Sequence, residues 1–370
     1  MTRNPPDSPT EPHAPNAPRA LVEPRATDLA DGTTVRLVNL NTWIGCLPRR
    51  LVKAVSLEPE GNKERRYQAL LAELRDREPD LITLQECLPL PGFVKRLADD
   101  LGYDLLWRVC NSGIRLGSFG LPTRVGRGEG LAILARREHR LEKAGVKRLS
   151  GFGLVTNWCA FQVGPVRWAL AAVANVRGRK VLVVNTHIRY AFPSREAFME
   201  GWATLHRRGV TRHELPPKWL SRMAKANQTD RDKELERLAE WTNRLREEHD
   251  ASLLIGADFN LDPDAPQVDR FLAATGLVNA LPALAPGALT WSPADNPNIA
   301  HSLTMTWPDG SPKSAVLQLM VLLDSIPQTP DHILLSPDLV LRGGGRAFDM
   351  PRAGAMASDH FGVWVDAELA

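Results

Sequence analysis

The chain has 370 residues, of which 43% are hydrophobic and 24% are charged, as is usual for a globular protein. This length permits one large domain or two ordinary ones, with a sizeable buried core in either case. The 46 basic and 43 acidic residues leave a net charge of +3, which neither indicates nor excludes a polyanionic partner, because a local basic groove would suffice.

Several classes of protein are disfavoured by the sequence. The N-terminus lacks the apolar core of a secretory signal, and no run of about 18 apolar residues is present to span a membrane. We therefore expect a soluble cytoplasmic protein, with peripheral membrane contact left open. The four cysteines, Cys46, Cys87, Cys110 and Cys159, form no CxxC pair, so we expect free, mostly buried thiols in a reducing compartment.

The N-terminal segment differs in composition from the rest of the chain. Seven prolines fall within the first 24 positions, among Ser, Thr, Asn and Ala. Such a segment buries too little apolar surface to offset its ordering entropy. We predict a disordered tail over residues 1–31 and a catalytic domain over residues 32–370, which contain no internal repeat and no shift of composition.

Alternating strand and helix patterns follow in chain order. Aliphatic runs predict strands at 35–41, 80–86, 130–135, 167–176, 180–187, 253–258, 332–335 and 361–365. Apolar residues at helical spacing predict helices at 64–77, 93–101, 230–248 and 265–274. Arg177-Gly178-Arg179 predicts a hairpin turn between two of the strands. Thr229 is the expected N-cap of the third helix, with Asp232 as its capping-box acid. This mixture predicts a layered α/β protein with mixed sheets.

Residues 188–228 are expected to form a long insert. It contains eight basic and three acidic residues, with Trp202 and Trp219 interleaved among them. One interpretation is a flap that grips a phosphate, a lipid headgroup or a nucleic acid. The other is a solvated loop that packs two tryptophans.

Polar residues end several of the predicted strands: Asn41, Gln85-Glu86, Asn185-Thr186-His187 and Asp258-Phe259-Asn260. Strand ends at one rim of a sheet commonly present ligands and catalytic groups. Carboxylate and amide oxygens are the ligands that Mg²⁺ prefers, and histidine transfers protons near neutral pH. Asp359 and His360 add a further carboxylate and imidazole.

At this point the chain resembles the endonuclease/exonuclease/phosphatase superfamily, which includes deoxyribonucleases, abasic-site endonucleases, neutral sphingomyelinases and inositol polyphosphate phosphatases. The matching motifs, in order, are LNTW (40–43), LQE (84–86), GEGLAIL (128–134), NTHI (185–188), GADFN (256–260), PDHIL (330–334) and SDH (358–360). The resemblance implies a four-layer sandwich of two mixed β-sheets packed face to face, with helices on the outside.

The resemblance also implies roles for these residues. Glu86 is similar to the principal metal ligand, with Asn41 and Asp359 near a Mg²⁺ ion that Mn²⁺ could replace. Asp258 and Asn260 resemble the pair that aligns the attacking water and the phosphate, where Asn41 also contributes. His360 resembles the catalytic histidine beside phosphorus, oriented by Asp331. His187 stands where nuclease and phospholipase members carry a catalytic histidine.

Three departures from the family pattern qualify these expectations. Ala257 replaces a common glycine, and Thr329-Pro330 replaces the usual Arg-Ile or Arg-Leu. The second change makes Asp324 a distant rival to Asp331 as the partner of His360. The third is the insert at 188–228, which matches no short loop of the family.

Three functions remain open. LNTW and the histidine of NTHI most resemble sphingomyelinase-type members, so we predict a monomeric phosphodiesterase acting on a phospholipid or a small phosphodiester. The first alternative is a magnesium-dependent DNA or RNA nuclease. The second is a catalytically silent binding module, which the intact set of carboxylates and histidines disfavours.

Overall fold

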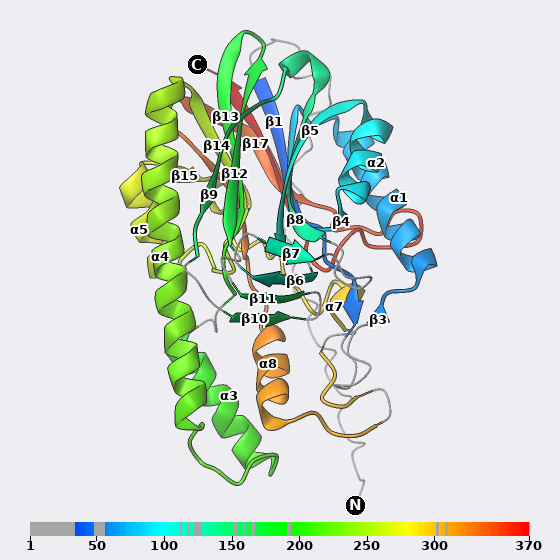
Figure 1. Ribbon diagram of the computed structural model, residues 1–370, viewed down its shortest axis with the longest axis vertical. Helices are drawn as coiled ribbons and strands as arrows, with labels where there is room; N and C mark the ends of the chain where they lie inside the picture. Colours follow the sequence, from blue (N-terminus) through cyan, green and yellow to red (C-terminus); the bar gives the residue numbers. More distant parts are fainter. Residues whose placement is uncertain are drawn as a thin grey trace, which may run out of the picture.

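The computed structural model describes residues 34–47, 56–111, 113–116, 119–121, 128–150, 154–157, 160–163, 167–190, 194–300, 303–307 and 310–369. Two six-stranded sheets dominate it (Figure 1). The first has the order β17 (Leu339–Ala347), β18 (Gly362–Leu369), β1 (Thr34–Asn41), β4 (Leu81–Leu90), β8 (Gly128–Arg136), β5 (Tyr103–Asn111). The second has the order β15 (Val278–Asn279), β16 (Asp331–Leu335), β14 (Ser252–Asp258), β13 (Arg179–His187), β12 (Trp168–Val176), β9 (Glu142–Arg148).

Both sheets are mixed, and they pack face to face. The β1–β4 and β13–β14 pairs are parallel, whereas the other pairs in these two sheets are antiparallel. One buried cluster takes Leu37 and Ile133 from the first sheet and Val183 and Leu254 from the second. The apolar residues on the inner face of each strand thus form one shared core.

Helices cover the outer faces. The helices α1 (Glu60–Arg77) and α2 (Gly92–Leu101) pack on the first sheet through Leu70, Leu74 and Leu97. The helices α4 (Lys218–His249) and α5 (Pro266–Thr275) pack on the second sheet through Leu238 and Phe271. The predicted four-layer sandwich is therefore confirmed (Figure 1).

A buried polar network joins the two sheets. Gln85 Nε2 donates to Asn39 Oδ1 and to Asn185 Oδ1, both at 2.8 Å. Asn185 Nδ2 donates back to the carbonyl oxygens of Leu84 and Ala132. Gly256 lies against this network, and a Cβ at that position would overlap the Thr83 hydroxyl. These contacts fix the relative position of the sheets directly behind the strand ends that carry the motifs.

The predicted strands and the hairpin are confirmed, with ends that differ by a few residues. Arg177 and Gly178 both have positive φ, 52° and 80°, as a tight hairpin turn requires. All four predicted helices are present, but the first begins at Glu60, four residues before its predicted start at 64, and the third begins twelve residues early at Lys218. The strands β5, β9 and β17 were not predicted, and neither was a small sheet of β10 (Leu154–Asn157), β11 (Ala160–Val163), β6 (Gly113–Leu116) and β7 (Phe119–Leu121).

The capping prediction at Thr229 is wrong. The helix α4 begins at Lys218, and the Thr229 hydroxyl donates to the Lys225 carbonyl inside it. The helix extends further because Leu220 and Ala224 continue its buried stripe against α3 (Arg195–Arg207) and α8 (Ala315–Asp324). The described part of the 188–228 insert is thus mainly helical. It buries Trp202 and leaves Trp219 56% exposed.

The remaining described elements are short: β2 (Cys46–Leu47), β3 (Ser56–Leu57), η2 (Arg137–His139), α6 (Ala280–Leu284) and α7 (Pro297–Ala300). Cys87 and Cys110 are buried free thiols, as expected. Cys159, the Cys46 side chain and the predicted tail at 1–31 lie outside the described residues and side chains. Among the described residues, no helix is long and apolar enough to cross a membrane.

Candidate active site

The ends of several strands meet at one edge of the sandwich. Asn41, His187 and Asp258 are the last residues of β1, β13 and β14, and β13 and β14 are parallel neighbours. Asp331 is the first residue of β16 and pairs with Asp258 across an antiparallel ladder. Topology alone therefore brings together residues that are far apart in the chain.

Glu86 reaches this edge through an irregularity in β4. The register between β4 and β8 shifts between Leu84 and Cys87, and Glu86 has a positive φ of 54°. A non-glycine residue in this conformation is uncommon and is often found at functional sites. Glu86 Oε2 accepts the Ile44 amide at 3.1 Å, while Oε1 lies 4.0 Å from His187 Nδ1.

Asp258 lies at the centre of the cluster and is 1% exposed. Its Oδ2 accepts Asn41 Nδ2 at 2.9 Å and lies 3.4 Å from His187 Nε2, while its Oδ1 accepts the Asn260 amide at 2.8 Å. Burial, and secondly the neighbouring Asp331 carboxylate, raise the pKa of Asp258 to about 7. Asp258 is therefore poised to gain or lose a proton near neutral pH.

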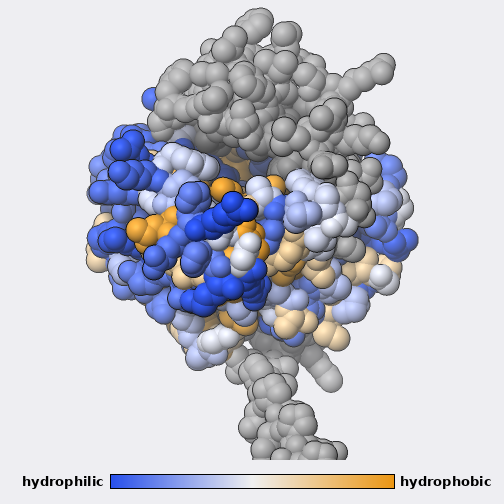
Figure 2. Space-filling model, turned by 90° about the horizontal axis from the view of Figure 1, so that it is seen from below, coloured by the Kyte–Doolittle hydropathy of each residue, from blue (hydrophilic) through white to orange (hydrophobic). Residues whose placement is uncertain are grey.

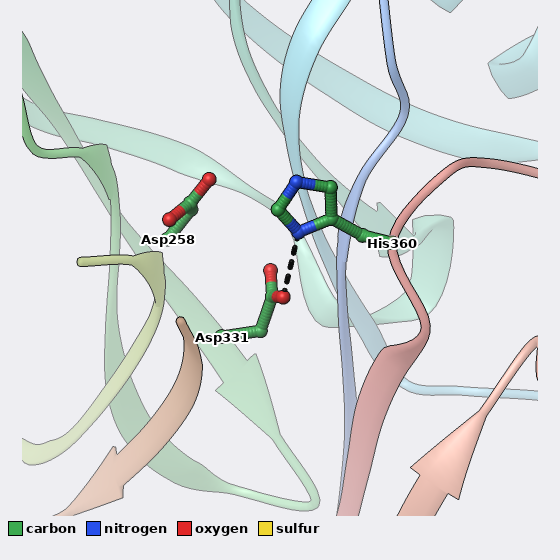
Figure 3. Close-up of side chains that lie close together, drawn as sticks. All are labelled: Asp258, Asp331 and His360. Carbon is green, nitrogen blue, oxygen red and sulfur yellow. Dashed lines mark hydrogen bonds and ion pairs between the residues drawn. The ribbon is translucent and has the colours of Figure 1, made fainter. Parts of the chain in front are cut away.

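His360 and Asp331 form a buried pair. His360 Nδ1 lies 2.8 Å from Asp331 Oδ2 (Figure 3), and the Asp258 carboxylate faces the same imidazole ring. Burial alone lowers the pKa of His360, but the carboxylates, Asp331 first, outweigh it and raise the pKa to about 10. The imidazolium form is thus favoured, and the carboxylate fixes the orientation of the ring.

Asp324 does not compete for His360. Its Oδ1 accepts the Tyr190 hydroxyl at 2.8 Å. The structure accommodates Thr329-Pro330 at this position. The Pro330 carbonyl accepts a hydrogen bond from the Phe259 amide at 2.8 Å, and this contact does not use the N–H that proline lacks. The structure therefore pairs His360 with Asp331 despite the unusual sequence before it.

His187 is in a different state from His360. It is 7% exposed, and burial, then the positive charges of Arg167 and His360, lower its pKa well below the ordinary value. Its Nδ1 has no hydrogen-bond partner among the described residues. A neutral His187 therefore faces a cationic His360 across Asp258.

Asp359 and Asn260 complete the predicted set. Burial is the main cause that raises the pKa of Asp359 to about 6, and the Glu86 carboxylate adds to it. Asn260 has a positive φ of 52°, and its Nδ2 donates to the Ile188 carbonyl at 3.0 Å. Every residue predicted for the site thus lies in this cluster or directly bonds to it.

The cluster has the donor chemistry of a divalent-cation site. One ligand atom from each of Asp258, Asp331 and His360 lies within 4.8 Å of the others, so these three could hold a metal. His360 Nδ1 and Asp331 Oδ2 already satisfy each other, however. Burial first, and a neighbouring carboxylate in each case, raise the pKa values of Glu86, Asp258 and Asp359, as expected where several carboxylates crowd into one buried site. Hard oxygen donors with surplus negative charge suit Mg²⁺ or Mn²⁺.

Several supporting residues escaped the sequence analysis. Glu129 is 4% exposed and accepts a hydrogen bond from Asn111. Its negative charge is the second cause, next to burial, of the raised pKa of Glu86. The Ser358 hydroxyl donates to the Asn41 carbonyl at 2.6 Å, and the ring of Trp291 lies edge-on to His360 at 5.1 Å. GEGLAIL and SDH contain two of these residues, but nothing in the sequence brings Trp291 to His360.

Comparison with solved structures shows the same fold. The human Nocturnin catalytic domain matches with a TM-score of 0.54 at 16% identity, over 91% of this chain and 95% of that one. A mannosyl-6-phosphatase from Bacteroides thetaiotaomicron VPI-5482 matches at 0.53 and 15% identity, over 90% and 99%. D. rerio TDP2 with a single-strand DNA product matches at 0.51 and 16% identity, over 90% and 99%. Identities this low establish a shared fold alone.

The sequence comparisons carry the assignment further. No curated protein matches the chain significantly. A model of the Endonuclease/Exonuclease/phosphatase family matches residues 40–360, which include all the motifs from LNTW to SDH. The chain therefore belongs to the endonuclease/exonuclease/phosphatase family of phosphoesterases, as its motifs predicted.

Proposed function

We propose that this protein is a divalent-metal-dependent phosphodiesterase acting on a phospholipid or another small phosphodiester. The observation that carries the proposal is the meeting of Glu86, Asp258 and Asp359 with a carboxylate-paired His360 at one edge of the sandwich. Phosphoryl transfer depends chiefly on positioning and charge neutralisation, and this cluster offers groups for both.

Glu86, Asp359 and the Asn41 side-chain oxygen would hold the Mg²⁺ or Mn²⁺ ion, which neutralises charge on the phosphate when bound. The Asn41 oxygen is fixed by the Trp43 amide at 3.1 Å, and its amide nitrogen is committed to Asp258. Asn41 thus links the proposed cation site to the proposed base.

Asp258 is the proposed general base. A base works best when its pKa is close to the working pH, and the pKa of Asp258 is about 7. The Asn260 amide and Asn41 Nδ2 orient its two oxygens, so that it can accept a proton from the attacking water. We also assign Asn260 and Asn41 to contacting the substrate phosphate.

His360 is the proposed proton donor. Asp331 holds it in the imidazolium form, so it can donate a hydrogen bond to the phosphate and a proton to the departing oxygen. The neutral His187 cannot supply that charge. We assign His187 to orienting Asp258: its Nε2 lies 3.4 Å from Asp258 Oδ2 and can direct the single N–H of a neutral imidazole to that oxygen.

A panel of substrates tests the proposal: bis-(p-nitrophenyl) phosphate and sphingomyelin as diesters, p-nitrophenyl phosphate and an inositol phosphate as monoesters, and supercoiled DNA, abasic DNA and RNA. We expect diester hydrolysis that EDTA abolishes and Mg²⁺ or Mn²⁺ restores. Preferred hydrolysis of the monoesters would contradict the diesterase proposal, while leaving a phosphoesterase.

The second candidate is a nuclease. It is favoured by the concentration of basic residues between 207 and 225, since a few phosphate contacts suffice for nucleic-acid binding. Cleavage of DNA or RNA in the panel, with no turnover of small diesters, would favour it. Absence of turnover on every substrate would favour the silent binding module.

The buried free thiols Cys87 and Cys110 are compatible with the cytoplasmic location that we propose.

A further inference from the structure

A small helical extension projects from the edge of the sandwich that carries the site. It consists of α3, the first turns of α4, and α8 (Figure 1). Its own core buries Phe198, Trp202 and Leu205 of α3, Leu220 and Ala224 of α4, and Leu319 and Leu323 of α8. The extension is therefore a packed unit with a defined outer surface.

The first turns of α4 and the segment just before them leave large apolar side chains in water. Leu215 is 66% exposed, Trp219 56% and Met223 40%. Trp219 and Met223 are four residues apart and share one face of the helix, whereas Leu220 and Ala224 occupy the buried face. Exposed apolar side chains gathered in one place usually indicate an interaction surface.

Basic residues border these apolar side chains. Lys218, Arg222 and Lys225 recur at spacings of four and three residues, so they form a row beside Trp219 and Met223. Arg208 and Arg212 precede them, and all five side chains are exposed. Seen from the end where the extension projects, apolar side chains lie among strongly hydrophilic ones (Figure 2).

The positive charge is concentrated here. Residues 207–225 contain six basic residues and one acidic residue, for a net charge of +5. The whole chain carries +3, so the rest of it carries −2. The acidic residue is Glu214. Among the described residues, Arg207 is the one basic residue of this segment in an ion pair, at 2.6 Å from Glu200. This local excess repels a second copy of the same surface and attracts an anionic one.

The extension is also tied to the site. Arg189, two residues after His187, donates its amide to Glu234 of α4 at 2.9 Å and its guanidinium to Asp230 at 3.2 Å. Arg231 of α4 donates to the Asn260 carbonyl at 3.0 Å. Tyr190 bonds to Asp324 at the end of α8. A surface that held the extension would therefore hold the site edge beside it.

We propose that residues 207–225 dock the protein on an anionic phospholipid bilayer, with Leu215, Trp219 and Met223 at the interface and the basic row on the headgroups. Tryptophan favours the membrane interface, where its ring is apolar and its N–H is polar, and basic amphipathic helices bind such surfaces. The exposed aliphatic side chains distinguish this surface from a nucleic-acid site, where aromatic stacking and cations would suffice. The inference rests on the proposed function only in making a membrane phospholipid the substrate.

Vesicle co-sedimentation tests the proposal directly. The full chain carrying Glu86→Gln is mixed with vesicles of phosphatidylcholine alone or mixed with phosphatidylserine, so that hydrolysis cannot change the lipid. We expect binding to the mixed vesicles that weakens as salt is raised. Each basic residue near an anionic surface contributes about fivefold, so Lys218→Gln with Arg222→Gln should weaken binding roughly 30-fold.

Matched controls come from the same helix. Lys233→Gln with Arg244→Gln removes the same charge from two exposed positions of α4 outside the segment and should leave vesicle binding unchanged. Trp219→Ala with Met223→Ala should weaken binding to mixed vesicles, while Met350→Ala, at a site that is 69% exposed elsewhere, should not.

Equal binding by all these variants, or no binding to mixed vesicles, would overturn the proposal. So would salt-sensitive binding of single-stranded DNA that depends on Trp219 and Lys218 in the absence of vesicle binding. Failure here is distinguishable from failure of the proposed function, because turnover of the soluble bis-(p-nitrophenyl) phosphate by the wild-type chain does not depend on a membrane.

Discussion

Nδ1 of His360 lies 2.8 Å from Oδ2 of Asp331, although 29 residues separate them in the chain. The bond joins the first residue of β16 to the loop before β18, and so joins the two sheets at the site edge. It also leaves the other nitrogen of the ring free to face Asp258 (Figure 3). This pair gives the first prediction.

Replacing Asp331 with asparagine should change the pH profile of turnover. Asp331 is the main group that opposes burial and raises the pKa of His360 to about 10. A proton donor must be protonated, so wild-type activity should fall only as pH rises through about 10. In Asp331→Asn, the alkaline limb of kcat/KM should move to lower pH, towards the ordinary histidine value of about 6.5.

His360→Ala should lower kcat by about 10² to 10⁴, the usual contribution of a general acid. Asp331→Asn should be milder at low pH, where the imidazole is still protonated. The same alkaline limb in wild type and Asp331→Asn would show that His360 is not the titrating acid.

The pKa of Asp258 predicts the acidic limb of the pH profile of turnover. The base must be ionised, and its pKa is about 7, so turnover should rise with pH through that value. Asp258→Asn should lower kcat by at least about 10² because the proposed base is lost. The measurement is kcat/KM against pH with a saturating divalent cation. The bound cation favours the ionised carboxylate, so the acidic limb should lie at or somewhat below about 7. Turnover by Asp258→Asn within a factor of about three of wild type would exclude Asp258 as the base.

Asp324 predicts a pH dependence of stability away from the proposed cation site. Burial raises its pKa from the ordinary value of 3.8 to about 6, and the hydrogen bond from the Tyr190 hydroxyl partly offsets this. Between these values the folded state binds more protons than the unfolded state, so the free energy of unfolding falls as pH rises from about 4 to 6. Asp324→Asn keeps an oxygen for Tyr190 and should remove that slope.

Urea unfolding across this range measures the effect. The variant should gain on the order of 3 kcal/mol over the wild type above pH 6, the equivalent of about two pKa units. A wild-type protein whose stability rises over the same window, with an unchanged slope in Asp324→Asn, would contradict the assignment.

Gly256 predicts how closely the sheets must approach. An added Cβ would overlap the Thr83 hydroxyl and lie 2.9 Å from Asn39 Oδ1. Gly256→Ala should therefore cost roughly 1–3 kcal/mol, as overpacking does. Gly61→Ala is the control, since its Cβ meets nothing within 4 Å in α1, and it should be neutral or slightly stabilising. Equal melting temperatures of the two variants would show that the polar network behind the site tolerates a wider spacing between the two sheets.

Much of the fold could be predicted from the sequence, because buried strands such as β1 (Thr34–Asn41) consist of consecutive, mostly apolar residues. Strand β5 was missed because most of its residues are only half-buried and carry no clear alternation. The start of α4 was missed because Leu220 and Ala224 find their partners on α3 and α8, which are distant in the chain. The local capping pattern at Thr229 does not outweigh these distant contacts.

The composition of the site was predictable for a different reason. Its residues stand at strand ends inside motifs, and parallel neighbours bring such ends together. What motifs do not reveal is the electrostatic state of each group. The pKa of His360 is raised because its carboxylate partner Asp331 outweighs burial, whereas burial, and then the charges of Arg167 and His360, lower the pKa of His187. That contrast follows only from tertiary contacts.

The central claim is a divalent-cation site at Glu86 that serves phosphodiester hydrolysis. The most direct test measures bis-(p-nitrophenyl) phosphate turnover by wild type and Glu86→Gln after EDTA treatment, with added Mg²⁺ or Mn²⁺, alongside calorimetric binding of Mn²⁺. We expect wild-type turnover to vanish in EDTA and to return with either cation, and Glu86→Gln to remain folded with little binding and at least about 100-fold lower kcat/KM. Wild-type turnover that EDTA leaves unchanged, or a Glu86→Gln protein that binds Mn²⁺ and turns over like wild type, would contradict the account.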